Sequence, residues 1–285
     1  MSVKYIDTHT HLNLSAFAED ALAVAQKCTE EGVALINVGT NLKSSRRAVE
    51  LAKEADNSVA IVGLHPVNTV SGYRDKSESD KKEETVGQGE GFVAKEFDRL
   101  AESKKVVGVG ECGFDYFHTA KDSYGAQEEA FIAQIEFANR HNLPLMIHTR
   151  NPKPGNESPT GRSVYEDVYE ILKRYAKVPF NIHFYAGTYK EAKKFFDLGG
   201  TISFTGVITF TKDYDEVVKA APLDLIHAET DAPYVAPVPY RGRRCEPWMV
   251  IEVYKKIAAI KSKPAEEVRE VLLENAVRHY RLDLV

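Results

Sequence analysis

The chain has 285 residues, of which 43% are hydrophobic, so it can bury a large core in one α/β domain or in two smaller ones. Its net charge of -5 provides no broad basic field for nucleic acid, and any phosphate-binding surface must be local. The 3 cysteines are odd in number, widely spaced and without a CxxC pair, so they support neither a disulfide framework nor a zinc ribbon. No apolar run is long enough to cross a bilayer, and a cytoplasmic protein without a membrane partner is expected.

Two histidines end the first predicted strand. The strand begins in the apolar run 3–6 and continues through Asp7 to His9 and His11. Residues two apart in an extended chain point to the same side, so both imidazoles can be directed at one metal ion. An isolated His-x-His also occurs as a pair of surface or helix-capping histidines. The metal interpretation therefore depends on further ligands along the chain.

The rest of the chain alternates between amphipathic helices and short apolar strands. Helices are predicted over residues 15–31, 42–55, 92–103, 123–141, 163–175, 189–198, 214–220, 247–261 and 264–280. Further strands are predicted over residues 34–38, 59–63, 106–110, 145–147, 180–182, 201–204 and 225–228. This alternation predicts an α/β fold of the TIM-type (β/α)8 barrel class. The rival is an open doubly wound sheet, but no Gly-x-Gly-x-x-Gly follows the first strand. We expect a single domain over residues 1–285, with a mobile charged insertion loop at 67–91.

Potential metal ligands follow the predicted strands with notable consistency. They are His9, His11, Glu111, His148, His183 and Asp231. The carboxyl ends of barrel strands form one mouth, so these side chains should converge there. They are more donors than one catalytic zinc uses, and two divalent ions are therefore expected. We assign His9, His11 and Asp231 to one ion, His148 and His183 to the other, and Glu111 as a bridge.

Such a centre can activate a water for hydrolysis of a phosphate or acyl bond. Glu111 and Asp231 are the predicted catalytic carboxylates, and Asp231 can accept the proton of the attacking water. Glu229 is a candidate supporting partner of Asp231.

Several motifs occur in one order along nearly the whole chain. They are Asp-Thr-His-Thr-His-Leu at 7–12, Gly-Leu-His-Pro at 63–66, Gly-Val-Gly-Glu-Cys-Gly-Phe-Asp-Tyr at 108–116, Ile-His-Thr-Arg at 147–150, His-Phe-Tyr-Ala-Gly at 183–187, Glu-Thr-Asp-Ala-Pro-Tyr at 229–234 and Arg-Gly-Arg-Arg at 241–244. Together they resemble the TatD family of metal-dependent deoxyribonucleases, in the amidohydrolase superfamily. The resemblance implies a TIM barrel, a divalent metal pair ligated as above, and 3′→5′ exonucleolytic or general phosphodiester hydrolysis. It also implies phosphate contacts from His65 and Arg150, with the Arg241 segment lining the cleft.

The chain departs from the family pattern beside these motifs. Phe184, Tyr185 and Ala186 replace the family's usual Cys-Phe-Ser, and Cys245 stands where the family commonly has Asn. All the metal ligands are kept, so the departures concern the choice of substrate.

Several residues have a structural alternative to a role in binding. His65 could hydrogen-bond backbone instead of phosphate, and Arg150 could form a salt bridge to Asp115 or Glu229. The tyrosines that could stack on a base or simply pack are Tyr116, Tyr185 and Tyr234. The histidines interpreted as structural are His118, His141, His227 and His279.

The leading hypothesis is a two-metal exodeoxyribonuclease or phosphodiesterase that acts on DNA ends, including single strands, as a monomer. Mg²⁺ or Mn²⁺ would serve catalysis, with Zn²⁺ as the alternative ion. A second hypothesis is an amide or ester hydrolase, such as an aminoacyl-tRNA deacylase. A third is a binding protein that keeps a metal site without turnover, against which the intact Glu111 and Asp231 count.

Overall fold

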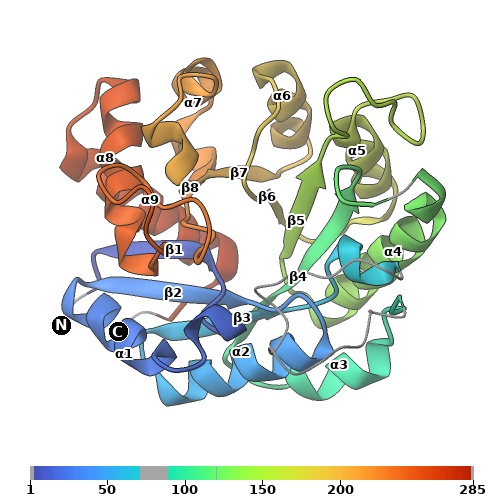
Figure 1. The fold of residues 1–285 in the computed structure, drawn as a ribbon, viewed down its shortest axis with the longest axis horizontal. Coiled ribbons are helices and arrows are strands. Elements are labelled where there is room, and N and C mark those ends of the chain that lie inside the picture. The colour runs from blue at the N-terminus through green and yellow to red at the C-terminus, as the bar shows by residue number, and fades with distance from the viewer. Residues whose placement is uncertain (1–2, 71–88, 120, 284–285) are drawn as a thin grey trace.

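A computed structural model describes residues 3–70, 89–119 and 121–283, and its strands form one eight-stranded parallel sheet in the order β1 to β8 (Figure 1). The strands are β1 (Tyr5–Thr10), β2 (Val33–Val38), β3 (Ser58–Val62), β4 (Val106–Asp115), β5 (Leu145–Arg150), β6 (Phe180–Ile182), β7 (Thr201–Phe204) and β8 (Ile226–Ala228). The ends of the sheet meet where Thr10 pairs in parallel with Ala232, next to a hydrogen bond of 2.9 Å from the Asp231 N–H to the His9 carbonyl. The predicted TIM-type barrel is confirmed.

Helices lie outside the ring of strands (Figure 1). They are α1 (Ala21–Glu30), α2 (Leu42–Glu54), α3 (Ala94–Ala101), α4 (Tyr124–His141), α5 (Val164–Tyr175), α6 (Tyr189–Asp197), α7 (Asp215–Ala220), α8 (Val250–Lys261) and α9 (Ala265–Tyr280). Short 3₁₀ turns are η1 (Ser15–Phe17), η2 (Pro66–Thr69), η3 (Lys121–Ser123), η4 (Gly206–Thr209), η5 (Leu223–Leu225) and η6 (Pro247–Met249). Reciprocal capping boxes begin two of the helices, through Asn41 with Ser44 at α2 and Thr188 with Glu191 at α6.

Two predicted helices are divided. The helix expected at 15–31 is split into η1 and α1, because Asp20 has a non-helical φ of -139° and its carboxylate is bound by Arg244. The helix expected at 247–261 begins as η6, with Pro247 in its first turn, and becomes α-helical at Val250.

β4 and β5 are longer than the sequence predicted. Residues Cys112–Asp115 pair with Ile147–Arg150, so Glu111 and His148 lie inside strands rather than after their ends. The pairing shifts between Val109 and Cys112, which is a bulge of the kind that redirects a side chain. The glycine at 113 permits this close pairing, since a Cβ there would lie 2.2 Å from the His148 carbonyl oxygen.

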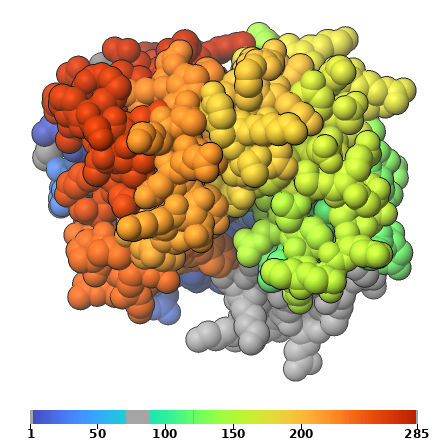
Figure 2. Space-filling model, turned by 90° about the horizontal axis from the view of Figure 1, so that it is seen from above, coloured from blue at the N-terminus to red at the C-terminus, as the bar shows by residue number. Residues whose placement is uncertain are grey.

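The core has an inner and an outer layer. Ile6, Ile36 and Met146 fill the inside of the barrel, and Tyr280 from the end of α9 packs against them. The outer layer lies between strands and helices, and each large apolar side chain buried there contributes about 1.5–3 kcal/mol. Because Tyr280 packs near the start of the strands, the opposite, carboxyl ends are left for a site. The space-filling view from above looks onto the flank of the barrel that is at the top in Figure 1, where segments from β5 onward, yellow-green to red, make up most of the surface (Figure 2).

The charged insertion predicted at 67–91 falls mainly on residues 71–88, which lie outside the described part of the chain; its first residues belong to η2. Across the described residues, none of the helices combines the length and the apolar character that a membrane crossing requires.

Candidate metal centre

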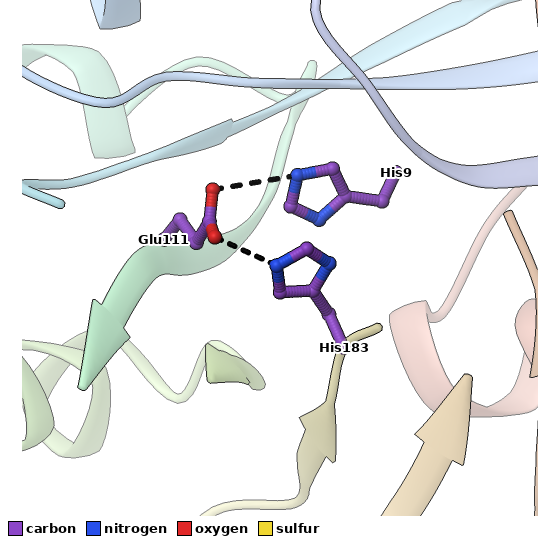
Figure 3. A group of neighbouring side chains, drawn as sticks. All are labelled: His9, Glu111 and His183. Atoms are coloured by element: carbon purple, nitrogen blue, oxygen red, sulfur yellow. Dashed lines mark ion pairs between the residues drawn. The ribbon is translucent and has the colours of Figure 1, made fainter. Parts of the chain in front are cut away.

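Glu111 lies at the centre of the site, and its two carboxylate oxygens face different partners (Figure 3). Oε2 is 3.4 Å from His9 Nε2, while Oε1 is 2.7 Å from both His183 Nε2 and His148 Nδ1. The bulge in β4 directs this buried carboxylate into the mouth of the barrel. A carboxylate placed in this way is suited to bridge two cations.

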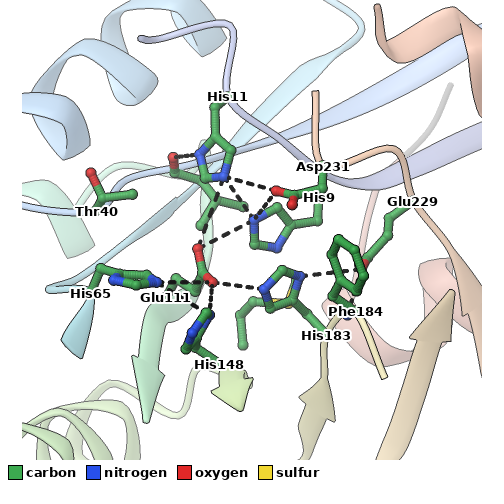
Figure 4. A network of polar contacts seen from close by, with 12 residues as sticks. His9, His11, Thr40, His65, Glu111, His148, His183, Phe184, Glu229 and Asp231 are labelled. Atoms are coloured by element: carbon green, nitrogen blue, oxygen red, sulfur yellow. Dashed lines mark hydrogen bonds and ion pairs between the residues drawn. The ribbon is translucent and has the colours of Figure 1, made fainter. Parts of the chain in front are cut away.

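The structure brings all the predicted ligands together (Figure 4). His9 and His11 approach through their Nε2 atoms at 3.0 Å, and His11 Nε2 is 3.3 Å from Asp231 Oδ1. Among the residues that the structure describes, three sets of side chains have ligand atoms close enough to share an ion. They are His9 with His11 and Asp231, His9 with Glu111 and His183, and His65 with Glu111 and His148.

Hydrogen bonds on the outer side of three imidazoles fix which nitrogen faces the centre. His11 Nδ1 donates to the Val38 carbonyl at 2.8 Å, and His183 Nδ1 faces Glu229 Oε1 at 3.2 Å. His148 Nε2 faces Asp115 Oδ2 at 3.1 Å. When these rings are neutral, their inward nitrogens carry lone pairs, and such nitrogens can stay at this spacing only with a cation between them, either a proton or a metal ion. The donor set fits divalent cations that accept imidazole and carboxylate ligands.

The charges of the cluster lead to the same conclusion. Burial and the neighbouring His183 lower the pKa of His9 to about 3. Burial also opposes protonation of His11, but Asp231 and Glu111 outweigh it and raise the pKa of His11 to about 9. For Glu111, burial is outweighed by the surrounding histidines, which hold its pKa well below the usual range. The site is thus a buried anionic centre that favours positive charge.

Asp7 holds the two halves of this centre together. Its buried carboxylate accepts from the Thr230 N–H at 2.9 Å, from the Thr230 hydroxyl, and from the His9 N–H at 3.3 Å. β1 and the loop after β8 are therefore tied at the residues next to His9 and Asp231. Asp7 was not among the predicted site residues, and its position two residues before the first histidine was the available signal.

A cavity of about 660 Å³ opens over the centre. The predicted ligands His11, Glu111, His148, His183 and Asp231 line it, together with His65 and Arg150. Its volume is in the range of cavities that hold a ligand of nucleotide size.

His65 makes the backbone contact that was one of its two alternatives, and its other ring nitrogen faces the centre. Its Nδ1 accepts from the Val67 N–H at 3.2 Å, so Nε2 carries the hydrogen of the neutral ring. Nε2 lies 3.5 Å from Glu111 Oε1 and 3.2 Å from His148 Nδ1. His65 is therefore placed as a hydrogen-bond donor beside the centre.

The two arginines predicted to contact substrate lie in different places. Arg150 is exposed at the cavity, its guanidinium 4.9 Å from the Phe117 ring, which Lys153 also approaches at 5.1 Å. Within the described ranges it forms none of the salt bridges considered for it. Arg241 does not line the cavity; it donates to the Ala236 carbonyl at 2.9 Å and lies over Phe210.

Glu229 has a different partner from the one expected, and two of the tyrosines take the packing alternative. Glu229 accepts from His183 and from the Phe184 N–H, so it supports His183 and not Asp231 as expected. Tyr116 and Tyr185 are buried with their hydroxyls bonded to Asp167 and to the Thr188 carbonyl, and they pack.

His118 is a residue that the sequence interpretation missed. It lines the cavity, and its Nδ1 is 2.9 Å from Asp115 Oδ2, the same oxygen that faces His148. Burial raises the pKa of Asp115, but these two histidines outweigh burial and lower it. The motif residue Asp115 was itself a signal, since a carboxylate four residues after Glu111 on the same strand points to the same side.

The chain matches known proteins along nearly its full length. The family model described as TatD related DNase matches residues 6–281. The uncharacterized metal-dependent hydrolase YabD of Bacillus subtilis (strain 168) is 33% identical over 282 residues, which cover 97% of this chain and 99% of the relative. The uncharacterized metal-dependent hydrolase YcfH of Escherichia coli (strain K12) is 29% identical over 284 residues, covering 98% of this chain and 96% of that protein. The crystal structure of YjjV, a TatD homologue from Escherichia coli K12, superposes with a TM-score of 0.80 at 25% identity, over 99% of this chain and 100% of that one.

Proposed function

Since the chain belongs to the family of TatD-related DNases and is a metal-dependent hydrolase, we propose that it removes nucleotides from the 3′ ends of DNA, single strands included. The family name supports a nucleic acid as substrate. The observation that carries the proposal is the geometry around Glu111, whose two oxygens face two groups of inward-directed imidazoles within one cavity.

The ligand set is proposed to hold two divalent ions, Mg²⁺ or Mn²⁺ during catalysis, with Zn²⁺ as the alternative. When bound, the ions would supply Lewis-acid stabilisation of phosphate oxygens and lower the pKa of a water. His9, His11 and Asp231 would hold one ion, His148 and His183 the other, and Glu111 both.

The protein's own residues would bind and orient the phosphodiester. The Nε2–H of His65 and the guanidinium of Arg150 both face the cavity, where each can donate to a phosphate oxygen. Asp231, whose side chain is 15% exposed, is placed to accept the proton of the attacking water. Attack on phosphorus would break its bond to the 3′ oxygen of the preceding nucleotide. The products would be a nucleoside 5′-monophosphate and a strand shortened by one residue.

The protein is proposed to act as a monomer and as one catalytic domain. The contributing strands all belong to one sheet and end at one mouth, so the centre described here needs no residue from another copy.

A comparison of substrate classes tests the reaction. We expect metal-stripped protein reloaded with Mg²⁺ or Mn²⁺ to hydrolyse bis(p-nitrophenyl) phosphate and single-stranded DNA, and to leave p-nitrophenyl acetate and aminoacyl-tRNA essentially intact. Faster turnover of aminoacyl-tRNA than of DNA would replace the proposal with acyl hydrolysis.

A further inference from the structure

Non-glycine residues with a left-handed backbone fall into two groups within the described segments. Those that end helices α4, α8 and α9 are Asn142, Ser262 and Arg281, which is ordinary for helix ends. Those that line the cavity are Phe184 (φ 46°), Asp231 (φ 57°) and Val235 (φ 52°). Bulky and β-branched residues adopt this conformation at a cost, and they keep it where the surrounding structure imposes it, often at functional sites. Asp231 is explained by the metal centre, but Phe184 and Val235 have no side-chain ligand atom.

The backbone of Phe184 is fixed by the carboxylate that supports the metal centre. Its N–H donates to Glu229 Oε1 at 2.6 Å, and the same oxygen faces His183 Nδ1 at 3.2 Å. The Phe184 ring lies edge-on to the His183 ring, with centroids 6.2 Å apart (Figure 4). Rotation of the backbone at Phe184 would break the bond to Glu229. The ring is thus held at the edge of the centre.

The other side of the same surface comes from the loops after β7 and β8. The Tyr234 ring lies 6.5 Å from the His11 ring. The neighbouring Val235 carbonyl approaches Gly206 so closely that a Cβ on the glycine would lie 2.4 Å from it. Val207, next to this glycine, lines the cavity as well. We call Phe184, Val207, Tyr234 and Val235 the apolar wall.

The cavity lining therefore combines two kinds of chemistry. It includes the metal ligands, His65 and Arg150, which suit a phosphate, and it includes the apolar wall and the methyl group of Ala186. A ligand that uses both carries an apolar group close to a phosphate. A nucleotide has this combination, because its base is attached through one sugar to its phosphate.

We propose that the apolar wall binds the base of the 3′-terminal nucleotide, by stacking on Phe184 and without distinguishing the four bases. The inference rests on the proposed function and names the part of the substrate that the metal centre does not touch. Aromatic rings hold single-stranded bases in this sequence-tolerant way, since every base has a π-face. Phe184, Val207 and Val235 have no hydrogen-bonding side-chain group with which to read a base edge.

Binding of product fragments to the metal-loaded protein tests the proposal. We would measure the dissociation constants of thymidine 5′-monophosphate, 2′-deoxyadenosine 5′-monophosphate and 2-deoxyribose 5-phosphate by calorimetry. Wild-type protein should bind both nucleotides about 10- to 100-fold more tightly than the sugar phosphate. Phe184→Ala should reduce this ratio to roughly threefold or less, as stacking is lost. Phe210→Ala, which removes a 42% exposed ring outside the cavity lining, should leave the ratio unchanged.

Each variant keeps the backbone N–H that binds Glu229, and bound metal is counted in every preparation. Phe184→Leu retains apolar volume without a ring, and it too should lose most of the ratio. Stacking on Phe184 would be overturned if wild type bound nucleotide and sugar phosphate equally well, or if Phe184→Ala weakened the binding of both ligands equally. It would also be overturned if Phe184→Leu kept the wild-type ratio of nucleotide to sugar-phosphate affinity. A large preference between the two bases would overturn the sequence-tolerant binding. None of these binding measurements requires turnover, so their outcome is independent of whether the protein cleaves DNA.

Discussion

Replacing Glu229 with Gln should weaken metal binding although Glu229 is not itself a ligand. Glu229 is 0% exposed, and its Oε1 accepts from the Phe184 N–H at 2.6 Å and faces His183 Nδ1 at 3.2 Å. Glutamine can keep one oxygen as acceptor but loses the charge, and a charge-assisted hydrogen bond is roughly twice as strong as a neutral one. Because the carboxylate raises the basicity of His183, we expect affinity for the ion at His183 to fall about 10- to 100-fold, or about 1.4–2.7 kcal/mol.

The assay is competition with a chromophoric chelator, using metal-stripped Glu229→Gln and wild type. Thermal unfolding of the same samples separates an effect on metal affinity from an effect on folding. Glu229 Oε2 has no hydrogen-bond partner in the described structure, and an amide nitrogen in its place would also lack one. Glu246→Gln is the control, because this carboxylate binds Lys27 and Trp248 away from the centre. An affinity within twofold of wild type, in a variant that is folded, would refute the supporting role of Glu229.

Other substitutions test separate parts of the structure. Arg150→Ala should lower kcat/KM on an oligonucleotide about 10- to 100-fold and reduce the dependence of that rate on salt concentration, and an unchanged salt dependence would argue against a phosphate contact. Burial lowers the pKa of His279 to about 3, so protonation favours the unfolded chain, and His279 alone should remove about 1.6 kcal/mol of stability between pH 6.5 and pH 5. His279→Gln should remove that loss in urea unfolding curves, and an equally steep pH dependence would contradict the assignment. Gly206→Ala places a Cβ 2.4 Å from the Val235 carbonyl and should cost about 1–3 kcal/mol, whereas Gly125→Ala, with open space in α4, should stabilise slightly, as melting temperatures would show.

The fold could be predicted because local signals agree with the global arrangement. Short apolar strands alternate with amphipathic helices, and that order is sufficient to select a barrel. The position of His183 directly after β6 indicated its place at the mouth for the same reason. The predicted ends of β4 and β5 were wrong because glycine and polar residues usually end a strand. In this chain the glycines at 110 and 113 instead allow close pairing through a bulge.

Partner choices could not be predicted in the same way. Which carboxylate supports which histidine depends on how neighbouring strands are offset, and the sequence does not contain that offset. Glu229 was interpreted as a partner of Asp231, but it lies beside His183, which follows β6. His118 was interpreted as structural because its orientation toward the cavity depends on its contact with Asp115, three residues earlier, and the position of Asp115 on the strand was the available signal.

Degradation of an end-labelled, single-stranded oligonucleotide tests the central claim most directly. Protein is stripped of metal, then supplied separately with Mg²⁺, Mn²⁺ or Zn²⁺, and wild type is compared with Glu111→Ala and Asp231→Asn. We predict stepwise loss from the 3′ end by wild type with at least one ion, and no loss by either variant. An intact oligonucleotide with every ion, from wild-type protein shown to hold its ions, would contradict the nuclease assignment.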